Sequence, residues 1–212
     1  MGVTRALATA VVFLVVSGAC GDDDDEGGRA STTSVPSDTT EGTATTEPPG
    51  PGEGEEALGE PTTGPVETEG FPDGAERSGR LLTDVRVAGH DGFDRVVFEL
   101  GDGLPDYRVE YVDPPIIEDP TGETLEVDGS AFLRVTMTAS GVDLSGPEAV
   151  EVYEGPDRIA PADADVAREL VASGDFEGIL SWVAGLDQRV DFGVAELDDP
   201  PRLVIDLRAP GS

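Results

Sequence analysis

The sequence lacks the side chains on which several kinds of catalytic and metal site depend. Its 212 residues include one cysteine, one histidine and one tryptophan, and all 13 basic residues are arginines. A single cysteine excludes an internal disulfide and a cysteine-rich zinc site, and a single histidine excludes a two-histidine metalloprotease motif. A Gly-x-Ser-x-Gly nucleophile motif is also missing. These absences argue against an enzyme.

Positive charge is also scarce. The 45 acidic residues outnumber the 13 arginines and give a formal net charge of −32. Such a surface repels phosphate polymers and anionic lipid headgroups, so we expect no nucleic-acid partner. Binding to an anionic wall polymer would need bridging divalent cations, whereas a neutral or zwitterionic glycopeptide would need none. The charge therefore favours a soluble domain with neutral or zwitterionic partners.

The amino terminus has the three-part pattern of a secretory signal. Arg5 precedes an apolar run over residues 6–16, and the small residues 17–19 lead to Cys20. The apolar run is shorter than the roughly 20 residues that a membrane-spanning helix needs. We therefore predict that residues 1–19 are a signal peptide that is removed on export.

The end of this signal resembles a bacterial lipobox, because small residues stand directly before the only cysteine. The resemblance implies a diacylglycerol on the thiol of Cys20, cleavage before it and acylation of the new amino terminus. Ser17 departs from the usual leucine. An ordinary cleaved signal and an uncleaved short anchor remain alternatives. Two or three acyl chains would hold the protein stably on the outer face of the plasma membrane, facing the cell wall.

Residues 20–79 read as the acylated cysteine followed by a linker. Between Gly21 and Gly79 there are 16 acidic residues and two arginines, many Pro, Thr and Gly residues, and almost no bulky apolar side chains. This composition cannot bury enough apolar surface to offset chain entropy, so we predict disorder. The linker would act as a tether between the membrane and the next domain.

From residue 80 to residue 210 the pattern changes to the period-two alternation of β-strands. Expected strands are Arg95–Leu100, Tyr107–Val112, Leu125–Val127, Ala131–Thr138, Ala149–Tyr153, Phe176–Leu186, Arg189–Leu197 and Arg202–Arg208. Asp165–Ala172 fits a helix by composition and a strand by alternation, and both remain open. Many short strands without a convincing long helix predict an all-β protein with an antiparallel β-sandwich.

Three blocks of this region carry a family resemblance. HDGFDRVVFEL (90–100), GDFEGILSWVAGL (174–186) and PPRLVIDL (200–207) resemble, in this order and spacing, the AMIN-like domain of secreted actinobacterial proteins and lipoproteins. The resemblance covers residues 81–208. It implies a β-sandwich related to the AMIN domain, a non-catalytic module that directs its host protein to peptidoglycan or the division site. It also favours a strand over residues 165–172.

Five residues are candidates for binding. Trp182 can stack on a sugar face, although packing in the core is the alternative. Its neighbours Leu180 and Ala184 share its face of the expected strand. The other candidates would form a polar edge if their side chains point outward: Arg95, Tyr107, Arg134 and Arg202. Structural ion pairing at strand ends, involving Asp94, Arg95 and Arg202, is the alternative for the charged members.

Little in the sequence points to a metal, a cofactor or catalysis, and we expect none of the three. His90 beside Asp91 in a Gly-rich turn is typical of a surface residue. A calcium site on Glu118, Asp119 and Glu123 is an alternative within the proline-rich loop. Carboxylate-only catalysis is another, because 29 acidic residues follow Gly79.

The sequence as a whole predicts an exported, membrane-anchored and non-catalytic lipoprotein. Its β-sandwich would bind peptidoglycan or a protein associated with the wall or with division. The alternative is a small-ligand-binding or sensory accessory lipoprotein, in which loops of the sandwich hold a soluble ligand.

Overall fold

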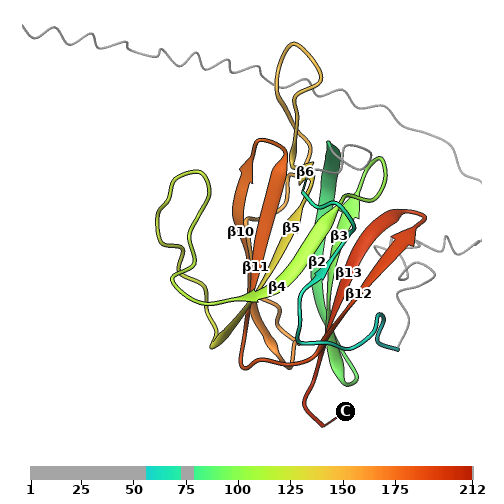
Figure 1. The fold of residues 1–212 in the computed structure, drawn as a ribbon, viewed down its shortest axis with the longest axis vertical. Coiled ribbons are helices and arrows are strands. Elements are labelled where there is room, and N and C mark those ends of the chain that lie inside the picture. Colours follow the sequence, from blue (N-terminus) through green and yellow to red (C-terminus); the bar gives the residue numbers. More distant parts are fainter. Residues whose placement is uncertain (1–55, 73–78, 212) are drawn as a thin grey trace, which may run out of the picture. The chain divides into compact units, whose positions relative to one another are not determined.

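The computed structural model describes residues 56–72 and 79–211. The predicted signal peptide, Cys20 and the linker up to residue 55 lie outside these residues. Within them the secondary structure is entirely β, and no helix is long and apolar enough to cross a membrane. The prediction of an all-β, mainly antiparallel sandwich is confirmed (Figure 1).

One layer of the sandwich is a six-stranded antiparallel sheet. Its strands, in spatial order, are β1 (Val66–Glu67), β4 (Tyr107–Val112), β5 (Ala131–Met137), β11 (Ile179–Leu186), β10 (Ala167–Phe176) and β9 (Arg158–Ile159). The centre of this sheet is formed by β4, β5, β11 and β10, whose pairing runs over most of each strand.

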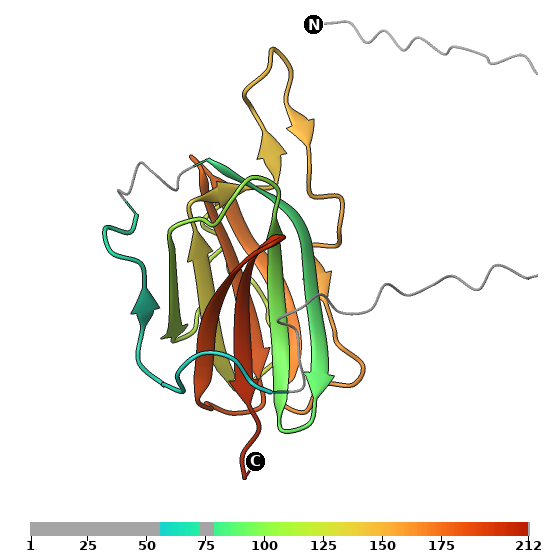
Figure 2. The same ribbon diagram turned by 90° about the vertical axis from the view of Figure 1, so that its right-hand side faces the viewer.

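The other layer is a five-stranded sheet. In spatial order it contains β12 (Phe192–Asp198), β13 (Pro201–Arg208), β3 (Phe93–Leu100), β2 (Arg80–His90) and β6 (Ala139–Ser140). Only the short β2–β6 pair among the described strands is parallel. A separate hairpin of β7 (Val142–Asp143) and β8 (Val150–Glu151) projects from one end of the sandwich (Figure 2).

The core lies between the two sheets and follows the alternation of the sequence. Val96, Phe98 and Leu100 of β3 face it, as do Leu180, Trp182 and Ala184 of β11. Leu82 and Val85 of β2 both face the core. Residues three positions apart in a regular strand would point to opposite faces. A register shift between Leu82 and Asp84 restores the pattern, because a bulge inserts one residue and turns the following side chains over.

Two local predictions have clear outcomes. The segment 165–172 is not helical, since β10 begins at Ala167 and pairs with β11 on one side and β9 on the other. Leu125–Val127, predicted as a strand, is not one. Instead the N–H of Leu125 donates to the carbonyl of Ile116, and the N–H of Asp128 donates to Glu169.

The fold begins earlier than the sequence suggested, so the assignment of residues 56–72 to a disordered linker needs correction. Val66 and Glu67 pair with β4, and Thr62 forms a β-bridge with Phe192 of β12. We call residues 56–62 the cover segment. It crosses the outer face of the five-stranded sheet near the β2–β3 turn, as the cyan chain in Figure 2 shows. This stretch has few apolar residues and is held largely by hydrogen bonds of its backbone. Its sequence pattern therefore does not show that it is folded.

The cover segment buries charged groups on the outer face of the sheet. The backbone of Leu58 donates to Asp206, and the carbonyl of Glu56 accepts from Arg95. Arg208 also donates to the carbonyl of Gly59, at 2.8 Å. Close approach requires glycine, because a Cβ on Gly193 would lie 2.2 Å from the Leu58 carbonyl oxygen. The domain therefore includes residues that precede its first long strand.

Candidate functional site: an acidic pocket at one end of the sandwich

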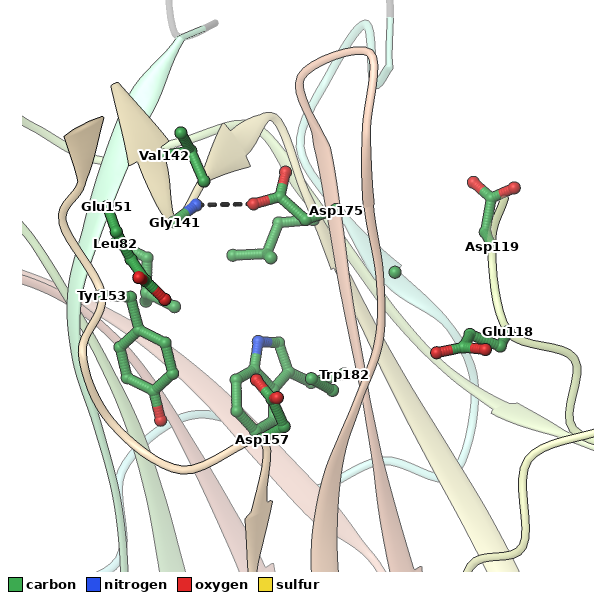
Figure 3. A pocket seen from close by; sticks show the side chains of 13 residues that line it. Leu82, Glu118, Asp119, Gly141, Val142, Glu151, Tyr153, Asp157, Asp175 and Trp182 are labelled. Carbon is green, nitrogen blue, oxygen red and sulfur yellow. Dashed lines mark hydrogen bonds between the residues drawn. The ribbon is translucent and has the colours of Figure 1, made fainter. Parts of the chain in front are cut away.

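A pocket of about 300 Å³ opens at the end of the sandwich where β2 begins. Leu82 comes from the five-stranded sheet, and Leu180 and Trp182 from the six-stranded sheet. The segment from Gly141 to Asp157, which carries the β7–β8 hairpin, closes one side (Figure 3). The pocket thus combines an apolar floor made by the core with walls made by loops.

Trp182 is fixed at the floor by two edge-on aromatic contacts. Its ring centroid lies 5.7 Å from that of Tyr153, with the planes at 87°, and 6.1 Å from that of Phe98. Such T-shaped pairs restrict the ring orientation. The side chain is 1% exposed, yet its indole Nε1 has no hydrogen-bond partner among the described residues. Figure 3 shows this nitrogen directed into the pocket.

Tyr153 forms the wall beside Trp182. Its hydroxyl donates to the carbonyl of Pro156 at 2.9 Å, which fixes the ring over the loop. Gly155 makes room for it, because a Cβ there would lie 2.5 Å from the hydroxyl oxygen. Burial raises the pKa of Tyr153, and the negative charges of Asp84 and Asp157 raise it further. The phenol is therefore neutral at physiological pH and serves as a packing surface.

The pocket lining carries five carboxylates and no arginine. They come from four separate segments of the chain: Glu118 and Asp119, Glu151, Asp157 and Asp175. The orientation of Asp175 is set by two donors, the N–H of Gly141 at 2.8 Å and the hydroxyl of Ser140 at 3.0 Å. Carboxylates concentrated around an opening with apolar walls create a negative potential that attracts cations.

The proline-rich loop between β4 and β5 brings two of these carboxylates to the pocket. The N–H of Asp119 donates to the carbonyl of Ser173 at 2.9 Å, at a bulge in β10. Gly174 permits the contact, since a Cβ on it would lie 2.8 Å from the carbonyl oxygen of Asp119. The bulge and the glycine therefore attach the loop to the strand that also carries Asp175.

An apolar groove adjoins the pocket and shares Val142 and Asp175 with it. Leu144 of the β7–β8 hairpin is 71% exposed there, and Phe176 at the end of β10 is 45% exposed. Apolar side chains that gather in one groove, in contrast to ones that lie singly on the surface, are typical of a contact surface. The acidic pocket and the groove form one continuous feature.

The five predicted binding residues do not form a common edge. Arg95, Arg134 and Arg202 have the expected outward register, but Arg95 and Arg202 are each only 2% exposed. Tyr107 faces the core, contrary to the expected outward register, because Val109 on the same face of β4 is fully buried. Trp182 packs in the core, and of the five it alone lines the acidic pocket.

The remaining candidates from the sequence, Asp94 and His90, make contacts within the domain. Asp94 accepts hydrogen bonds from the N–H groups of residues 165, 166 and 167. His90 stacks on Phe93 with ring centroids 4.8 Å apart. Within residues 56–72 and 79–211 no three His, Cys, Asp or Glu side chains are grouped so that they could hold a metal ion. Glu118, Asp119 and Glu123 are among these residues, so the calcium alternative gains no support.

A family model for the AMIN-like domain matches residues 80–209, which include every strand from β2 to β13. The chain belongs to the AMIN-like domain family. No curated protein and no solved structure gives a significant match. AMIN-like domains are typically non-catalytic binding modules of the cell envelope, so membership gives the chain an envelope-associated role. The match begins after the cover segment and β1.

The acidic pocket of this AMIN-like domain was missed at the level of sequence. Its carboxylates are spread over residues 118–175, and none stands in a motif. The one available signal was Trp182, the only tryptophan in the chain. Its alternation with Leu180 and Ala184 indicated burial, but alternation cannot show that one edge of the indole lacks a partner.

Proposed function

We propose that this chain is a lipid-anchored, non-catalytic envelope protein whose AMIN-like domain binds peptidoglycan or a wall-associated partner. The observation that carries the proposal is the family match over residues 80–209, from β2 to β13. The lipobox-like end at Cys20 and the acidic linker add an anchor and a tether. The binding surface is the acidic pocket with its adjoining apolar groove, because both are open and lie on the same end of the domain.

Wall binding is tested by co-sedimentation of residues 21–212 with purified sacculi. This form keeps every described residue, including the cover segment. We expect the protein to sediment with the sacculi and to remain soluble without them. Replacing Leu144 and Phe176 with Ser should reduce sedimentation, whereas replacing Ile117, which is 41% exposed outside both features, should not. Absence of sedimentation at every salt and calcium concentration would refute wall binding.

Anchoring is tested separately with the full chain in a bacterial host. Mass spectrometry of the membrane fraction should show an amino-terminal cysteine carrying acyl chains. A Cys20→Ser variant should leave the membrane fraction, because no thiol remains to be acylated. An unmodified Cys20 on protein found in the medium would contradict the anchor and leave wall binding to be judged on its own test.

A second candidate function, binding of a small soluble ligand, is supported by the pocket itself. Its volume of about 300 Å³ is at the lower end of the range of small-molecule sites. A rise in melting temperature with one member of a library of wall fragments and amino acids would favour this function. The absence of any such shift, combined with sedimentation on sacculi, would favour the first.

A further inference from the structure

The floor of the acidic pocket offers a hydrogen-bond donor that the protein does not use. Trp182 is almost fully buried, and its Nε1 has no acceptor among the described residues. Buried N–H groups are nearly always paired, because an unpaired one loses its hydrogen bond to water without replacement. Figure 3 shows the nitrogen on the side of the indole that faces the pocket. An oxygen acceptor from a ligand would satisfy it.

The rim of the pocket favours a cationic group on the ligand. Glu151 and Asp157 are exposed on the side formed by the hairpin segment, and Asp175 lies across from them. The lining holds no cationic side chain to neutralise these charges. The carboxylates are also not gathered into a group of three that could hold a metal ion. An organic cation fits this arrangement, because the summed negative potential of the rim attracts it and it needs direct contact with only one carboxylate.

We propose that the pocket binds a ligand with a primary ammonium group and a nearby oxygen acceptor, as found at the ends of amino acids. The negative rim formed by Glu151, Asp157 and Asp175 attracts the ammonium group, which contacts one of these carboxylates at a time, and the oxygen accepts the hydrogen bond from Trp182 Nε1. The inference deepens the proposed function and rests on its assignment of the binding surface. The ligand can be a free amino acid or an ammonium-bearing residue of a wall peptide, since both present the same chemistry.

The single tryptophan allows a direct test. Residues 21–212 are titrated with L-lysine while the emission of Trp182 is followed, with calorimetry in parallel. We expect a saturable change in emission that weakens as ionic strength rises, because exposed charges are screened by salt. Diacetyl-lysine, which has no ammonium group, should not bind, and cadaverine, which has no oxygen, should bind more weakly than lysine.

Variants test the rim carboxylates and the indole N–H separately. Glu151→Gln combined with Asp157→Asn should weaken lysine binding about three- to tenfold, the size expected for two partly exposed charge contacts. The matched control is Asp198→Asn combined with Asp199→Asn, which removes two exposed carboxylates from the β12–β13 turn and should change nothing. Trp182→Phe, measured by calorimetry, should also weaken binding, because it removes the donor and keeps an aromatic ring.

The two sources of the ligand are separated with sacculi whose amino groups have been acetylated. Loss of sedimentation on acetylated sacculi identifies the ammonium group of a wall peptide, whereas lysine binding with unchanged sedimentation identifies a free amino acid. Lysine that fails to bind at tens of millimolar, or that binds no better than diacetyl-lysine or a neutral disaccharide, would overturn the inference. Sedimentation on untreated sacculi would then still support wall binding, so the two failures can be told apart.

Discussion

Arg95 and Asp206 form a bidentate ion pair on the outer face of the five-stranded sheet. The Nε and Nη2 atoms of Arg95 each lie 2.7 Å from a carboxylate oxygen of Asp206. Their side chains are 2% and 0% exposed, because the cover segment lies over them. The backbone of Leu58 adds a donor to the same carboxylate. Both charges are therefore removed from water and depend on each other for compensation.

Removal of one partner should destabilise the domain strongly. Asp206→Ala removes the carboxylate that makes two hydrogen bonds to the buried Arg95 guanidinium, and we expect a loss of about 3–5 kcal/mol in the free energy of unfolding. Urea denaturation followed by Trp182 fluorescence measures it. Asp84→Ala is the control, because the Asp84–Arg86 pair is 46% and 42% exposed and should contribute less than about 1 kcal/mol. Equal effects of the two variants would contradict the importance of burial.

The cover segment should contribute to stability although it precedes the family match. Protein that begins at residue 80 loses β1, the Thr62–Phe192 bridge and the hydrogen bonds to Asp206 and Arg208. We expect it to be about 2–4 kcal/mol less stable than protein that begins at residue 56, because several hydrogen bonds to charged groups disappear together. Identical urea midpoints for the two lengths would show that the segment contributes nothing.

The contact between the cover segment and β12 depends on glycine. In Gly193→Ala the new Cβ would meet the Leu58 carbonyl oxygen at 2.2 Å, so the segment must move away from the sheet. We expect a lower melting temperature and faster hydrogen exchange at the Leu58 N–H. Gly146→Ala in the β7–β8 hairpin is the control, because its nearest atom would lie at 3.7 Å. Unchanged exchange at Leu58 in Gly193→Ala would argue against the close packing.

Asp94 should be as important as the buried ion pair, although it lies on the other face of β3. Its carboxylate accepts the N–H groups of residues 165, 166 and 167 and so fixes the start of β10. Asp94→Ala should cost about 3–5 kcal/mol, since three N–H groups lose their acceptor together. Asp94→Asn keeps one acceptor oxygen and should cost less. The exposed neighbour variant Asp91→Asn should be neutral, and a similar cost there would undermine the interpretation.

Glu169 should make stability depend on pH. Burial alone would raise its pKa, but Arg158, with a nitrogen 2.6 Å away, and the N–H of Asp128 outweigh burial and lower the pKa below 4.5. Because the pKa is lower in the folded state, the contribution of Glu169 to stability is complete above its unfolded-state pKa. This contribution disappears as the pH falls through its folded-state pKa. Glu169→Gln should therefore cost about 1–2 kcal/mol at pH 7, and the cost should shrink as the pH falls below the unfolded-state pKa and through the lowered folded-state pKa. A cost that stays constant as the solution is acidified through this range would contradict the assignment.

Much of the fold was predictable because each core strand is half buried. The alternation of Val96, Phe98 and Leu100, and of Leu180, Trp182 and Ala184, identified the inward faces correctly. The same rule assigned Arg95 to the outward face, but it could not reveal the cover segment above it. Alternation describes one strand at a time, whereas the exposure of Arg95 depends on a segment about forty positions earlier in the chain.

The candidate site was less predictable than the fold for a related reason. The pocket carboxylates come from the proline-rich loop, the β7–β8 hairpin, the loop before β9 and the end of β10. Their proximity depends on tertiary details such as the bulge at Ser173 and the close approach at Gly174. The ambiguity over residues 165–172 had a similar origin, since composition favoured a helix while sheet pairing on both sides required a strand.

The cover segment contacts the end of the five-stranded sheet that is remote from the acidic pocket. Glu56 contacts Arg95, which pairs with Ala88 near the far end of β2, whereas Leu82 near the start of β2 lines the pocket. The six residue steps from Leu82 to Ala88 span roughly 20 Å along the strand. A pull on the chain ahead of Glu56 would therefore act on the pole of the domain remote from the pocket mouth. Attachment and ligand capture would not compete for the same surface.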